Sequence, residues 1–309
     1  MKMRTIAIVI LLVLLGALPQ LLPRFYTYVG AIVLLTGLLA TSLNLAIGYG
    51  GIYQFHHAVF YGVGAYGTAL ALTRSPLPAS LALAAGPLAA AALSLLMGVI
   101  CIRLSKLYFG MLQISLGSLV WATAYRWYSF TGGDDGIHGV PLPEPLASPE
   151  GAYVFTLVVT ALCFFAMHRI VRSPFGVALQ GIRDNPVRSA AIGVAVKRHQ
   201  LAALVIAGFF GGVAGALFVV VDTSVFPDMM FWTFSLEVLV MCLLGGMYTF
   251  FGPLTGAAII VLLRVFASAW TTYWSLLLGV LLALVIVFLP DGVLGYLVRR
   301  FRYAERVRA

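Results

Sequence analysis

The amino-acid sequence predicts an all-α polytopic membrane protein with about ten transmembrane helices, or eight in an alternative count. Two observations lead to this fold class: the scarcity of charge and the recurrence of long apolar runs. Of the 309 residues, 62% are hydrophobic and only 9% are charged, whereas soluble globular domains carry roughly 25% charged residues. A chain with so few charges cannot cover a surface that faces water, so we expect lipid around it. This composition excludes a soluble enzyme, a disordered chain and a nucleic-acid-binding domain.

Ten apolar runs approach the length of about 20 residues that a helix needs to cross the hydrocarbon core of a bilayer. They lie near residues 5–22, 28–47, 58–73, 79–101, 107–129, 151–171, 199–221, 232–250, 253–268 and 272–289. Two of these runs, 58–73 and 253–268, are short and rich in glycine or other small residues. Either can form a broken or re-entrant helix, which is why eight spans are the alternative to ten.

The N-terminal run follows Lys2 and Arg4 and resembles a signal peptide in this respect. However, Pro19-Gln20 stands where a signal peptide needs small residues for cleavage. We therefore expect a retained first span. Because the sequence contains no long linker, we expect a single transmembrane domain over residues 1–309.

The basic residues orient the spans, because short loops rich in Lys and Arg remain on the cytoplasmic side during insertion. With the N-terminus inside, cytoplasmic segments hold 15 of the 19 basic residues, namely Lys2, Arg4, Arg103, Lys106, Arg169, Arg172, Arg183, Arg188, Lys197, Arg198, Arg299, Arg300, Arg302, Arg306 and Arg308. The external loop 130–150 is acidic instead. We therefore expect cytoplasmic N- and C-termini, with a basic cytoplasmic tail over residues 290–309.

A cytoplasmic segment, residues 173–193, has the pattern of short capped helices outside the lipid. Ser173 is a suitable N-cap, and the proline after it suits the first helical position. Apolar residues recur at helical spacing on one face, and polar residues lie off that stripe. The stripe consists of Phe175, Ala178, Leu179 and Ile182, and the polar set of Gln180, Arg183 and Asp184. Asn185-Pro186 ends this helix and starts a second one, which Gly193 ends.

The amphipathic segment 173–193 must pack its apolar stripe on something, and two interpretations stay open on periodicity alone. It can lie on the bilayer as an interfacial helix, or it can dock on a cytoplasmic partner. Gly176 and Gly181 weaken its intrinsic helicity. Neighbouring spans or a partner must therefore help to hold it.

The chain lacks the sequence patterns of catalysis and of cofactor binding. None of its three lysines, Lys2, Lys106 and Lys197, follows a glycine as in a phosphate-binding P-loop. The adjacent His56-His57 would point to different faces of a helix and suit metal chelation poorly. The three cysteines lie in apolar stretches without a C-x-x-C pair, so no metal or disulfide framework follows. We expect a non-catalytic protein that binds no metal or cofactor of its own.

One acidic residue, Glu237, lies inside a predicted span. A charged residue at a helix centre costs ~2.5–3.5 kcal/mol in a membrane, so Glu237 should face protein or water and have a partner. It is either a contact of the solute path or half of a structural ion pair. Arg126 and Arg264 are the candidate partners, because both lie toward the outer side.

A glycine-rich break in the apolar pattern follows residue 47, and Asn44, Gln54 and His57 flank it. Unwound backbone at such a break can line a cavity. These three residues are either substrate-path contacts or caps of helix ends at the cytoplasmic boundary. Residues 50–55 at this break weakly resemble residues 245–250, although chance matching of glycine and aromatic residues explains the likeness as well.

Four glycines, Gly208, Gly211, Gly212 and Gly215, recur at three- and four-residue spacing. Small residues at this spacing let helices approach closely in membranes. The spacing therefore favours helix packing over a ligand site.

The segment 173–193 resembles the coupling segment of permeases in the branched-chain amino acid class of ABC importers. Stretches elsewhere agree with this family in order and spacing from about residue 36 to residue 297, and the chain looks closer to the M-type than to the H-type member of the permease pair. The matching stretches are Leu43-Asn44-Leu45, Gly48-Tyr49, His57-Ala58, Phe60-Tyr61-Gly62-Val63-Gly64-Ala65-Tyr66, Thr131-Gly132-Gly133-Asp134-Asp135-Gly136-Ile137, Glu237, Leu244-Gly245-Gly246, Gly252-Pro253 and Pro290-Asp291-Gly292.

The resemblance implies the membrane-spanning half of an ATP-driven importer for branched-chain or related hydrophobic amino acids, in a prokaryotic cell (inner) membrane. Its partners would be a homologous second permease, two cytoplasmic ATPase subunits that bind ATP and Mg, and a periplasmic or extracellular solute-binding protein. Carried onto this chain, Phe175, Leu179 and Ile182 would fill a groove of the ATPase. Arg183 and Asp184 would fix the register of that contact.

The sequence departs from the family pattern before the third span, where Tyr53-Gln54-Phe55-His56-His57 is bulkier and more basic than usual. If this stretch lines the path, the solute differs from leucine, isoleucine or valine, and urea or short amides are alternatives. A function of another class, a stand-alone channel or an ion-coupled carrier, would more often place several ionisable residues within the membrane. Only Glu237 meets that description here.

Overall fold

The computed structural model describes residues 15–104 and 106–270, with Tyr273, Leu276, Gly279, Val280, Ala283, Phe288 and residues 292–296. In these parts of the chain the structure is all-helical without strands, and one isolated bridge joins Ile137 and Val225. The predicted spans near 5–22 and 272–289 and the tail 290–309 lie largely outside the described residues.

Each of the eight apolar runs between residues 24 and 270 forms a helix. In chain order these helices are α2 (Arg24–Asn44), α3 (Ala58–Arg74), α4 (Ala79–Cys101), α5 (Lys106–Arg126), α8 (Pro149–Arg172), α11 (Val196–Asp222), α12 (Trp232–Gly245) and α13 (Gly252–Trp270). Among the described residues, 6 helices are long and apolar enough to cross a membrane. The two that fall short of this length are α3, with 17 residues, and α12, with 14.

The structure corrects two details of the predicted spans. The run at 253–268 is not a broken helix, because α13 continues through 19 residues. The shortest of the eight is instead α12, which we expected over 232–250 but which ends at Gly245. Gly246 follows with a φ of 109°, a backbone conformation that glycine adopts readily and other residues rarely. Hydropathy alone does not detect such a helix end.

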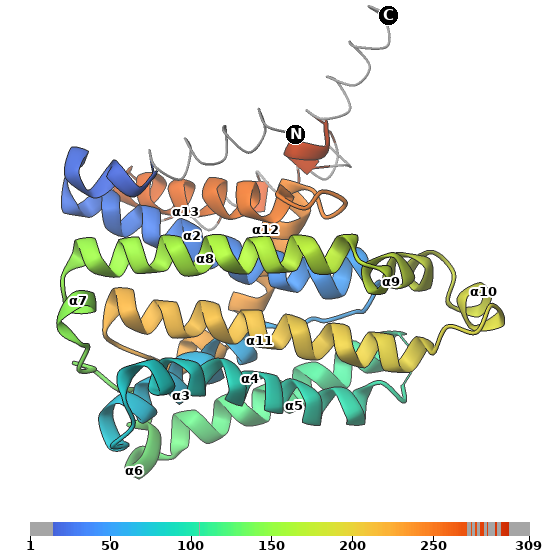
Figure 1. The fold of residues 1–309 in the computed structure, drawn as a ribbon, viewed down its shortest axis with the longest axis horizontal. Helices are drawn as coiled ribbons and strands as arrows, with labels where there is room; N and C mark the ends of the chain where they lie inside the picture. Colours follow the sequence, from blue (N-terminus) through green and yellow to red (C-terminus); the bar gives the residue numbers. More distant parts are fainter. Residues whose placement is uncertain are drawn as a thin grey trace, which may run out of the picture.

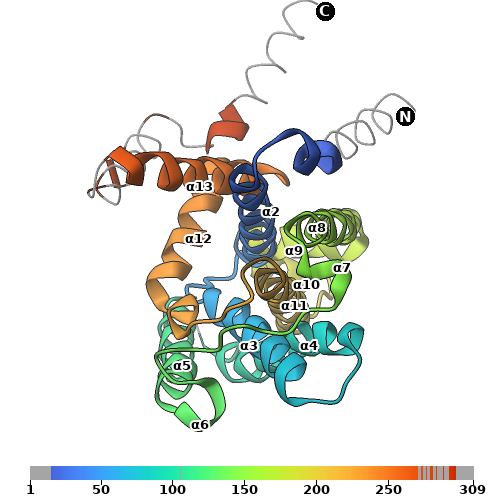
Figure 2. The same ribbon diagram turned by 90° about the vertical axis from the view of Figure 1, so that its left-hand side faces the viewer.

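Helices α2 and α11 form the centre of the bundle. Figure 2 shows α2 surrounded by α8, α11, α12 and α13, and α11 also packs against α3 and α4. The main apolar core lies where these helices meet. It includes Leu35, Leu38, Leu39, Leu43, Phe210, Leu217, Met241 and Ile260. The buried face of α2 therefore holds together elements from both halves of the chain.

The glycines of α11 bring their helix into backbone contact with α3 and α4. A Cβ atom on Gly215 would lie 1.9 Å from the carbonyl oxygen of Tyr61 in α3. A Cβ atom on Gly212 would lie 2.5 Å from the Cβ of Ala90 in α4. The predicted role of this glycine cluster in close helix packing is confirmed.

The connections between helices alternate between two ends of the bundle (Figure 1). The elbow end carries α9 (Pro174–Asp184) and α10 (Pro186–Ala191), together with the turns 45–57 and 246–251. The opposite end, which we call the loop end, carries α6 (Tyr128–Thr131) and α7 (Glu144–Ala147). There Arg74 donates a hydrogen bond to the carbonyl oxygen of Ser129 at 3.2 Å.

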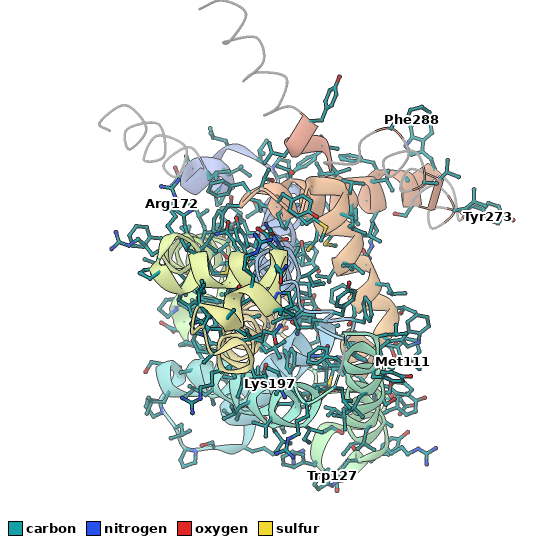
Figure 3. The ribbon with its side chains drawn as sticks, turned by 90° about the vertical axis from the view of Figure 1, so that its right-hand side faces the viewer. Met111, Trp127, Arg172, Lys197, Tyr273 and Phe288 are labelled. Carbon is teal, nitrogen blue, oxygen red and sulfur yellow. The ribbon has the colours of Figure 1, made fainter. Side chains whose placement is uncertain are left out.

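Charge is divided between these two ends. Figure 3 looks onto the elbow end, where Arg172 and Lys197 are labelled. The basic residues of this end are Arg103, Lys106, Arg169, Arg172, Arg183, Arg188, Lys197 and Arg198, and the acidic residues of the loop end are Asp134, Asp135, Glu144, Glu150, Asp222 and Asp228. The charge asymmetry that the sequence predicts is thus an asymmetry between the two ends of the described bundle.

Candidate functional site

The elbow, residues 173–193, consists of two short helices with the caps that the sequence predicts. The Ser173 hydroxyl accepts a hydrogen bond from the backbone N–H of Gly176 at 3.4 Å. The Asn185 side chain accepts one from the backbone N–H of Arg188 at 2.9 Å. Both helices have proline in the first turn, where its missing N–H is harmless. The sequence therefore fixes this bend locally.

The apolar stripe of α9 packs against the chain's own helices. The side chains of Leu179 and Ile182 are 0% and 2% exposed. Leu179 belongs to a cluster with buried residues Ala46, Ile52, Cys101, Phe109, Ala203, Leu204 and Ala207. Phe175 lies at the edge of this cluster and stacks on His199 of α11, with 5.6 Å between the ring centroids. We expected these three residues to fill a groove of a partner, but the structure uses them to attach α9 to the bundle.

Other residues form the outward surface of the elbow. Val187 of α10 and Ile192 at its end are each 78% exposed. The neighbouring Arg188 and the more distant Asp184 are also exposed. Exposed apolar side chains near charged ones are available for contact with another protein. Contacts of the elbow with another protein would therefore involve this surface.

Arg183 connects the elbow to the nearby ends of two other helices. Its guanidinium donates a hydrogen bond to the carbonyl oxygen of Gly48 at 2.7 Å. The same group lies 5.4 Å from the centroid of the Tyr248 ring, in the turn after α12. It also forms an ion pair with Asp184 at 2.9 Å. A cation at the end of α2 is favourable because the last carbonyl groups of a helix carry partial negative charge.

The end of α2 is irregular where Arg183 meets it. The helix widens into a π-helical turn, Leu45–Tyr49, and the backbone is then non-helical until α3 begins. A Cβ atom on Gly48 would lie 2.5 Å from the carbonyl oxygen of Met247. The break after α2 and the turn after α12 therefore touch each other, and only glycine permits this approach.

A hydrogen-bonded chain of buried side chains crosses the break. The Ser42 hydroxyl donates to the carbonyl oxygen of Leu39 at 2.7 Å, so it accepts from Nε2–H of His57 at 2.8 Å. His57 Nδ1 then accepts from the Gln54 amide at 2.7 Å. These bonds assign His57 the neutral tautomer with the proton on Nε2. His57 is the N-cap residue of α3, but its side chain makes no capping hydrogen bond. The first backbone N–H of α3, that of Ala58, donates instead to the Ser235 hydroxyl of α12 at 2.9 Å.

Several buried polar atoms near this break have no hydrogen-bond partner among the described residues. They are Oδ1 and Nδ2 of Asn44, Oε1 of Gln54, Nε2 of His56 and Oε1 of Gln113. Such atoms cost about 1–3 kcal/mol each unless water or a ligand satisfies them. Gln54 and His57 belong to the hydrogen-bonded chain that includes Ser42. The Asn44 side chain lies apart from this chain, against Gly48. None of the three forms a side-chain cap.

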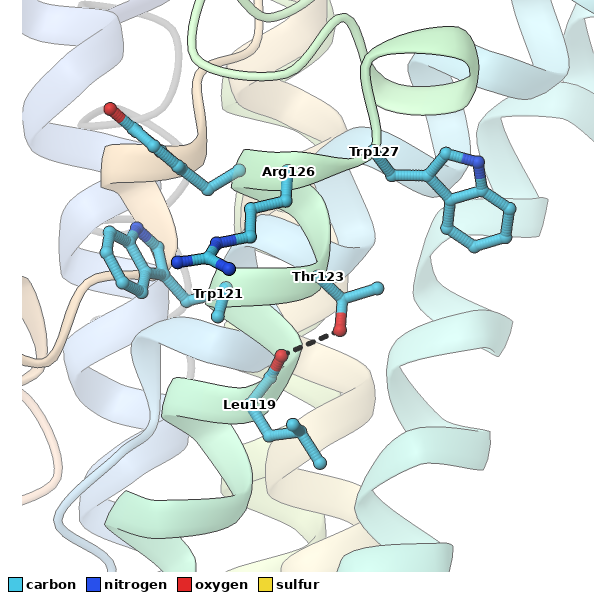
Figure 4. Close-up of a pocket in the computed structure, with 7 residues that line it drawn as sticks. Leu119, Trp121, Thr123, Arg126 and Trp127 are labelled. Carbon is cyan, nitrogen blue, oxygen red and sulfur yellow. Dashed lines mark hydrogen bonds between the residues drawn. The ribbon is translucent and has the colours of Figure 1, made fainter.

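Glu237 of α12 forms an ion pair with Arg264 of α13. This pair settles which of the two candidate arginines is the partner of Glu237. Arg126 lies on α5 beside a separate hollow of about 600 Å³, where its side chain extends toward Trp121 (Figure 4). Because α12 packs on α13, Arg264 is the arginine within reach.

Arg264 also lines a second cavity of about 340 Å³ in the half of the bundle nearer the loop end. Its walls come from α2, α3, α11, α12 and α13, and they include Tyr28, Ile32, Leu35, Phe218, Phe234 and Val261. Asp228 lines the same cavity from the loop 223–231. Nothing in the sequence pairs this aspartate with Arg264.

Sequence analysis also missed Ser42, Ser235 and Gln113. A hydroxyl within an apolar helix is common in membrane proteins and breaks no pattern, so these serines gave no signal. Gln113 is buried beside residues 53–56, where Gly110 and Gly117 of the same helix face lie against Phe55 and His56. Among the described residues, no group of three or more His, Cys, Asp or Glu side chains is placed to hold a metal ion.

A bundle of apolar helices whose central helix breaks into a polar segment, with a capped amphipathic elbow at one end, has the architecture of a polytopic membrane transport subunit. The chain belongs to a known family of this class. Residues 25–287 match the family described as the branched-chain amino acid transport system permease component. The predicted family is confirmed, and with it the role of a non-catalytic permease component.

Curated relatives agree with this assignment. The chain is 27% identical over 314 residues to the high-affinity branched-chain amino acid transport system permease protein LivM of Escherichia coli (strain K12). This alignment covers 93% of this chain and 74% of the relative. The chain is 25% identical over 315 residues to the probable branched-chain amino acid transport permease protein LivM of Methanocaldococcus jannaschii, which covers 83% of this chain and 89% of the relative. No solved structure gives a significant match.

Proposed function

We propose that this chain forms half of the translocation pathway of an ATP-driven importer for branched-chain or related hydrophobic amino acids. Its partners are a homologous second permease, two cytoplasmic ATPase subunits that bind ATP and Mg, and a periplasmic or extracellular solute-binding protein. The observation that carries this proposal is the elbow, which has an exposed surface of its own and a direct connection to the ends of α2 and α12.

The elbow end faces the cytoplasm of a prokaryotic cell, and both termini lie on that side. The support for this orientation is the basic character of the elbow end. Short basic loops are retained on the cytoplasmic side during insertion, whereas acidic residues have little influence. Partners that hydrolyse ATP are cytoplasmic, so this orientation brings the elbow to them.

The residues of the elbow divide into three roles. Phe175, Leu179 and Ile182 hold α9 on the bundle, since their side chains are wholly or partly buried against it. Val187 and Ile192, with Arg188 and Asp184 nearby, contact the ATPase. Arg183 transmits movement of the elbow to the backbone of Gly48. In this arrangement the stripe of α9 faces the bundle, and the exposed residues of α10 face the ATPase.

The solute path runs along the polar break after α2. The support is the set of buried, unpartnered polar atoms at Asn44, Gln54 and His56, because polar atoms facing a path can be satisfied by water or solute. Glu237 and its partner Arg264 lie on the same route nearer the loop end. Branched-chain amino acids are the favoured solute because of the family, and urea or short amides are the alternative that a competition assay on the solute-binding protein distinguishes.

The docking surface is tested by the double change Val187→Asp with Ile192→Asp, in the chain co-expressed with its ATPase subunits. Two buried charges at an apolar contact should abolish co-purification of the ATPase, while the variant still inserts into the membrane. Leu77→Asp is the matched control, because Leu77 is an exposed apolar residue of the loop end, and it should retain the ATPase. Retention of the ATPase by the double variant would overturn the docking surface, and uptake by this chain alone under an ion gradient would overturn the ATP-driven function.

A further inference from the structure

A third hollow, of about 260 Å³, lies at the elbow end beside the attachment of the elbow. Five parts of the chain line it: the break after α2, the segment after α4, the start of α5 and the first residues of α10 and α11. Ile52 and Phe109 in its wall belong to the cluster that buries Leu179. Gly51, also in the wall, touches Arg183, because a Cβ atom on this glycine would lie 2.9 Å from the Cγ of the arginine. A ligand in this hollow would therefore contact residues that hold the elbow in place.

The polar side chains of the lining suit an anion. They are Lys197 and Gln200 of α11 and Tyr53 of the break, and each of them can donate a hydrogen bond. The lining holds no carboxylate, and among the described residues no ion pair involves Lys197. The exposed Arg103 stands in the chain between two residues of the lining, Ile102 and Leu104, and adds a second positive charge nearby.

The remaining wall is apolar and continues onto the outer surface of α5. Leu104 of the lining is 44% exposed, so the hollow opens to the surroundings of the protein. Leu107 and Tyr108 of the first turn of α5 are more exposed still. Figure 3 shows Lys197 and Met111, a further exposed residue of α5, at this end of the bundle. Exposed apolar side chains of a membrane helix are compatible with lipid tails, and the charged residues that begin here mark the depth of the head groups.

We propose that this hollow binds an anionic phospholipid, with the phosphate on Lys197 and the acyl chains along the exposed side chains at the start of α5. Basic pockets between membrane helices on the cytoplasmic side bind anionic head groups. A water-soluble anion would match Lys197 but not the apolar wall, and an amino acid would find no carboxylate for its ammonium group. The proposal goes beyond the importer function and uses only the orientation of the elbow end.

A lipid in the hollow would connect the elbow to the break after α2. Gly51 lines the hollow from the break, and Pro186 lines it from the first residue of α10. An occupied hollow therefore holds these two segments at a fixed separation. Anionic lipid would in this way strengthen the contact that Arg183 already makes with the end of α2.

The direct test is a titration of phosphatidylglycerol onto the complete, delipidated transporter, followed by native mass spectrometry, with phosphatidylcholine as the neutral probe. The wild type should bind phosphatidylglycerol more tightly than phosphatidylcholine. Lys197→Gln removes one positive charge and should bind phosphatidylglycerol about fivefold more weakly or worse. Equal affinity of the wild type for the two lipids would overturn the proposal.

Arg198→Gln is the matched control for Lys197→Gln. Arg198 is the next residue of α11, is exposed and does not line the hollow, so its loss changes the charge of the surface by the same amount. It should leave the affinity for phosphatidylglycerol at the wild-type value. Equal weakening in both variants would mean that lipid responds only to the general charge of this end, and would overturn the site.

Val196→Phe tests the shape of the hollow while Lys197 is kept. Val196 lines the hollow at the start of α11, so a larger ring there occupies space that the head group needs. The variant should lose the preference for phosphatidylglycerol, and its melting temperature in phosphatidylcholine alone should equal that of the wild type. A preserved preference in this folded variant would overturn the location.

Hydrogen exchange in nanodiscs locates the bound lipid. With phosphatidylglycerol in place of phosphatidylcholine, the amides of residues 51–53 and 187–189 should exchange more slowly in the wild type and in Arg198→Gln, but not in Lys197→Gln. Equal slowing in all three proteins would overturn the proposal. So would displacement of the lipid by inorganic phosphate, or binding that disappears when the ATPase subunits are present. None of these measurements requires transport, so a failure of ATP-dependent uptake would contradict the proposed function alone.

Discussion

Arg183→Ala should loosen the elbow from the ends of α2 and α12, while the buried Leu179 and Ile182 still hold α9 on the bundle. The guanidinium donates to the carbonyl oxygen of Gly48 at 2.7 Å, and a hydrogen bond from a charged group is worth about 1.5–3 kcal/mol. Its contact with the ring of Tyr248 at 5.4 Å adds about 0.5–1 kcal/mol at a partly exposed site. The ion pair with Asp184 lies within α9 and contributes nothing to attachment.

These two contacts together supply about 2–4 kcal/mol, which corresponds to a roughly 30- to 1,000-fold change in the ratio of attached to detached elbow. Hydrogen exchange of the elbow amides in the assembled transporter measures detachment, and the ratio of solute transported to ATP hydrolysed measures coupling. We expect faster exchange confined to the elbow and a lower transport ratio, with ATP hydrolysis retained.

Arg169→Ala is the matched control for Arg183→Ala. Arg169 is an exposed arginine at the same end of the bundle, so its loss changes the charge of the surface by the same amount. It should leave both measurements at the wild-type value. If Arg183→Ala itself shows wild-type exchange and a wild-type transport ratio, then the arginine does not connect the elbow to the helix ends, and the reasoning fails.

Three further variants test the packing, the buried network and the ion pair. Gly215→Ala places a Cβ atom 1.9 Å from the backbone of α3 and should destabilise the bundle by about 1–3 kcal/mol or more. The loss appears as a lower melting temperature in detergent. Gly181→Ala should leave the melting temperature unchanged, because the atom nearest to the added Cβ lies 3.4 Å away. Ser42→Ala leaves a buried imidazole N–H unpaired and should lower stability by about 1–3 kcal/mol in the same assay. Its control, Ser115→Ala, removes only an exposed hydrogen bond within its own helix and should cost little. Equal melting temperatures of the two variants would contradict the network. Glu237→Gln should assemble normally but transport less, and full uptake by this variant would refute a transport role for the charge.

The sequence predicts the helices of the described bundle because polar or glycine- and proline-containing stretches separate the apolar runs, although the end of α12 at Gly245 escapes this reading. It also predicts the elbow, since Ser173 and Asn185 are recognisable caps and Leu179 and Ile182 recur at helical spacing. The spacing does not tell which surface covers the stripe. Amphipathicity predicts that one face of α9 is buried, and only the folded structure shows that the bundle itself buries it. For this reason Leu179→Asp, which the sequence suggests as a docking variant, would test core packing instead.

The partner of Glu237 illustrates the same limit for electrostatics. Arg126 and Arg264 both lie at suitable depths, and the penalty for an unpaired charge requires a partner without naming it. The choice is made by the packing of α12 on α13, a contact between helices that the spacing of residues within either helix does not encode. The His57 network was less predictable still, because its acceptor Ser42 lies within an apolar helix and breaks no pattern.

The weak likeness between residues 50–55 and 245–250 has a physical explanation in the structure. In each pair of glycines the second has a positive φ, 62° at Gly51 and 109° at Gly246, and each pair stands where a helix ends at the elbow end. Both turns also meet Arg183, since a Cβ atom on Gly51 would lie 2.9 Å from the Cγ of this arginine and Tyr248 lies beneath its guanidinium. The shared glycines therefore reflect a shared requirement, a sharp stop that lets one arginine of the elbow touch the ends of α2 and α12 together. A movement of the elbow by its proposed ATPase would then reach both helices through a single side chain, which is why we expect the loss of Arg183 to uncouple transport more than the loss of any exposed charge nearby.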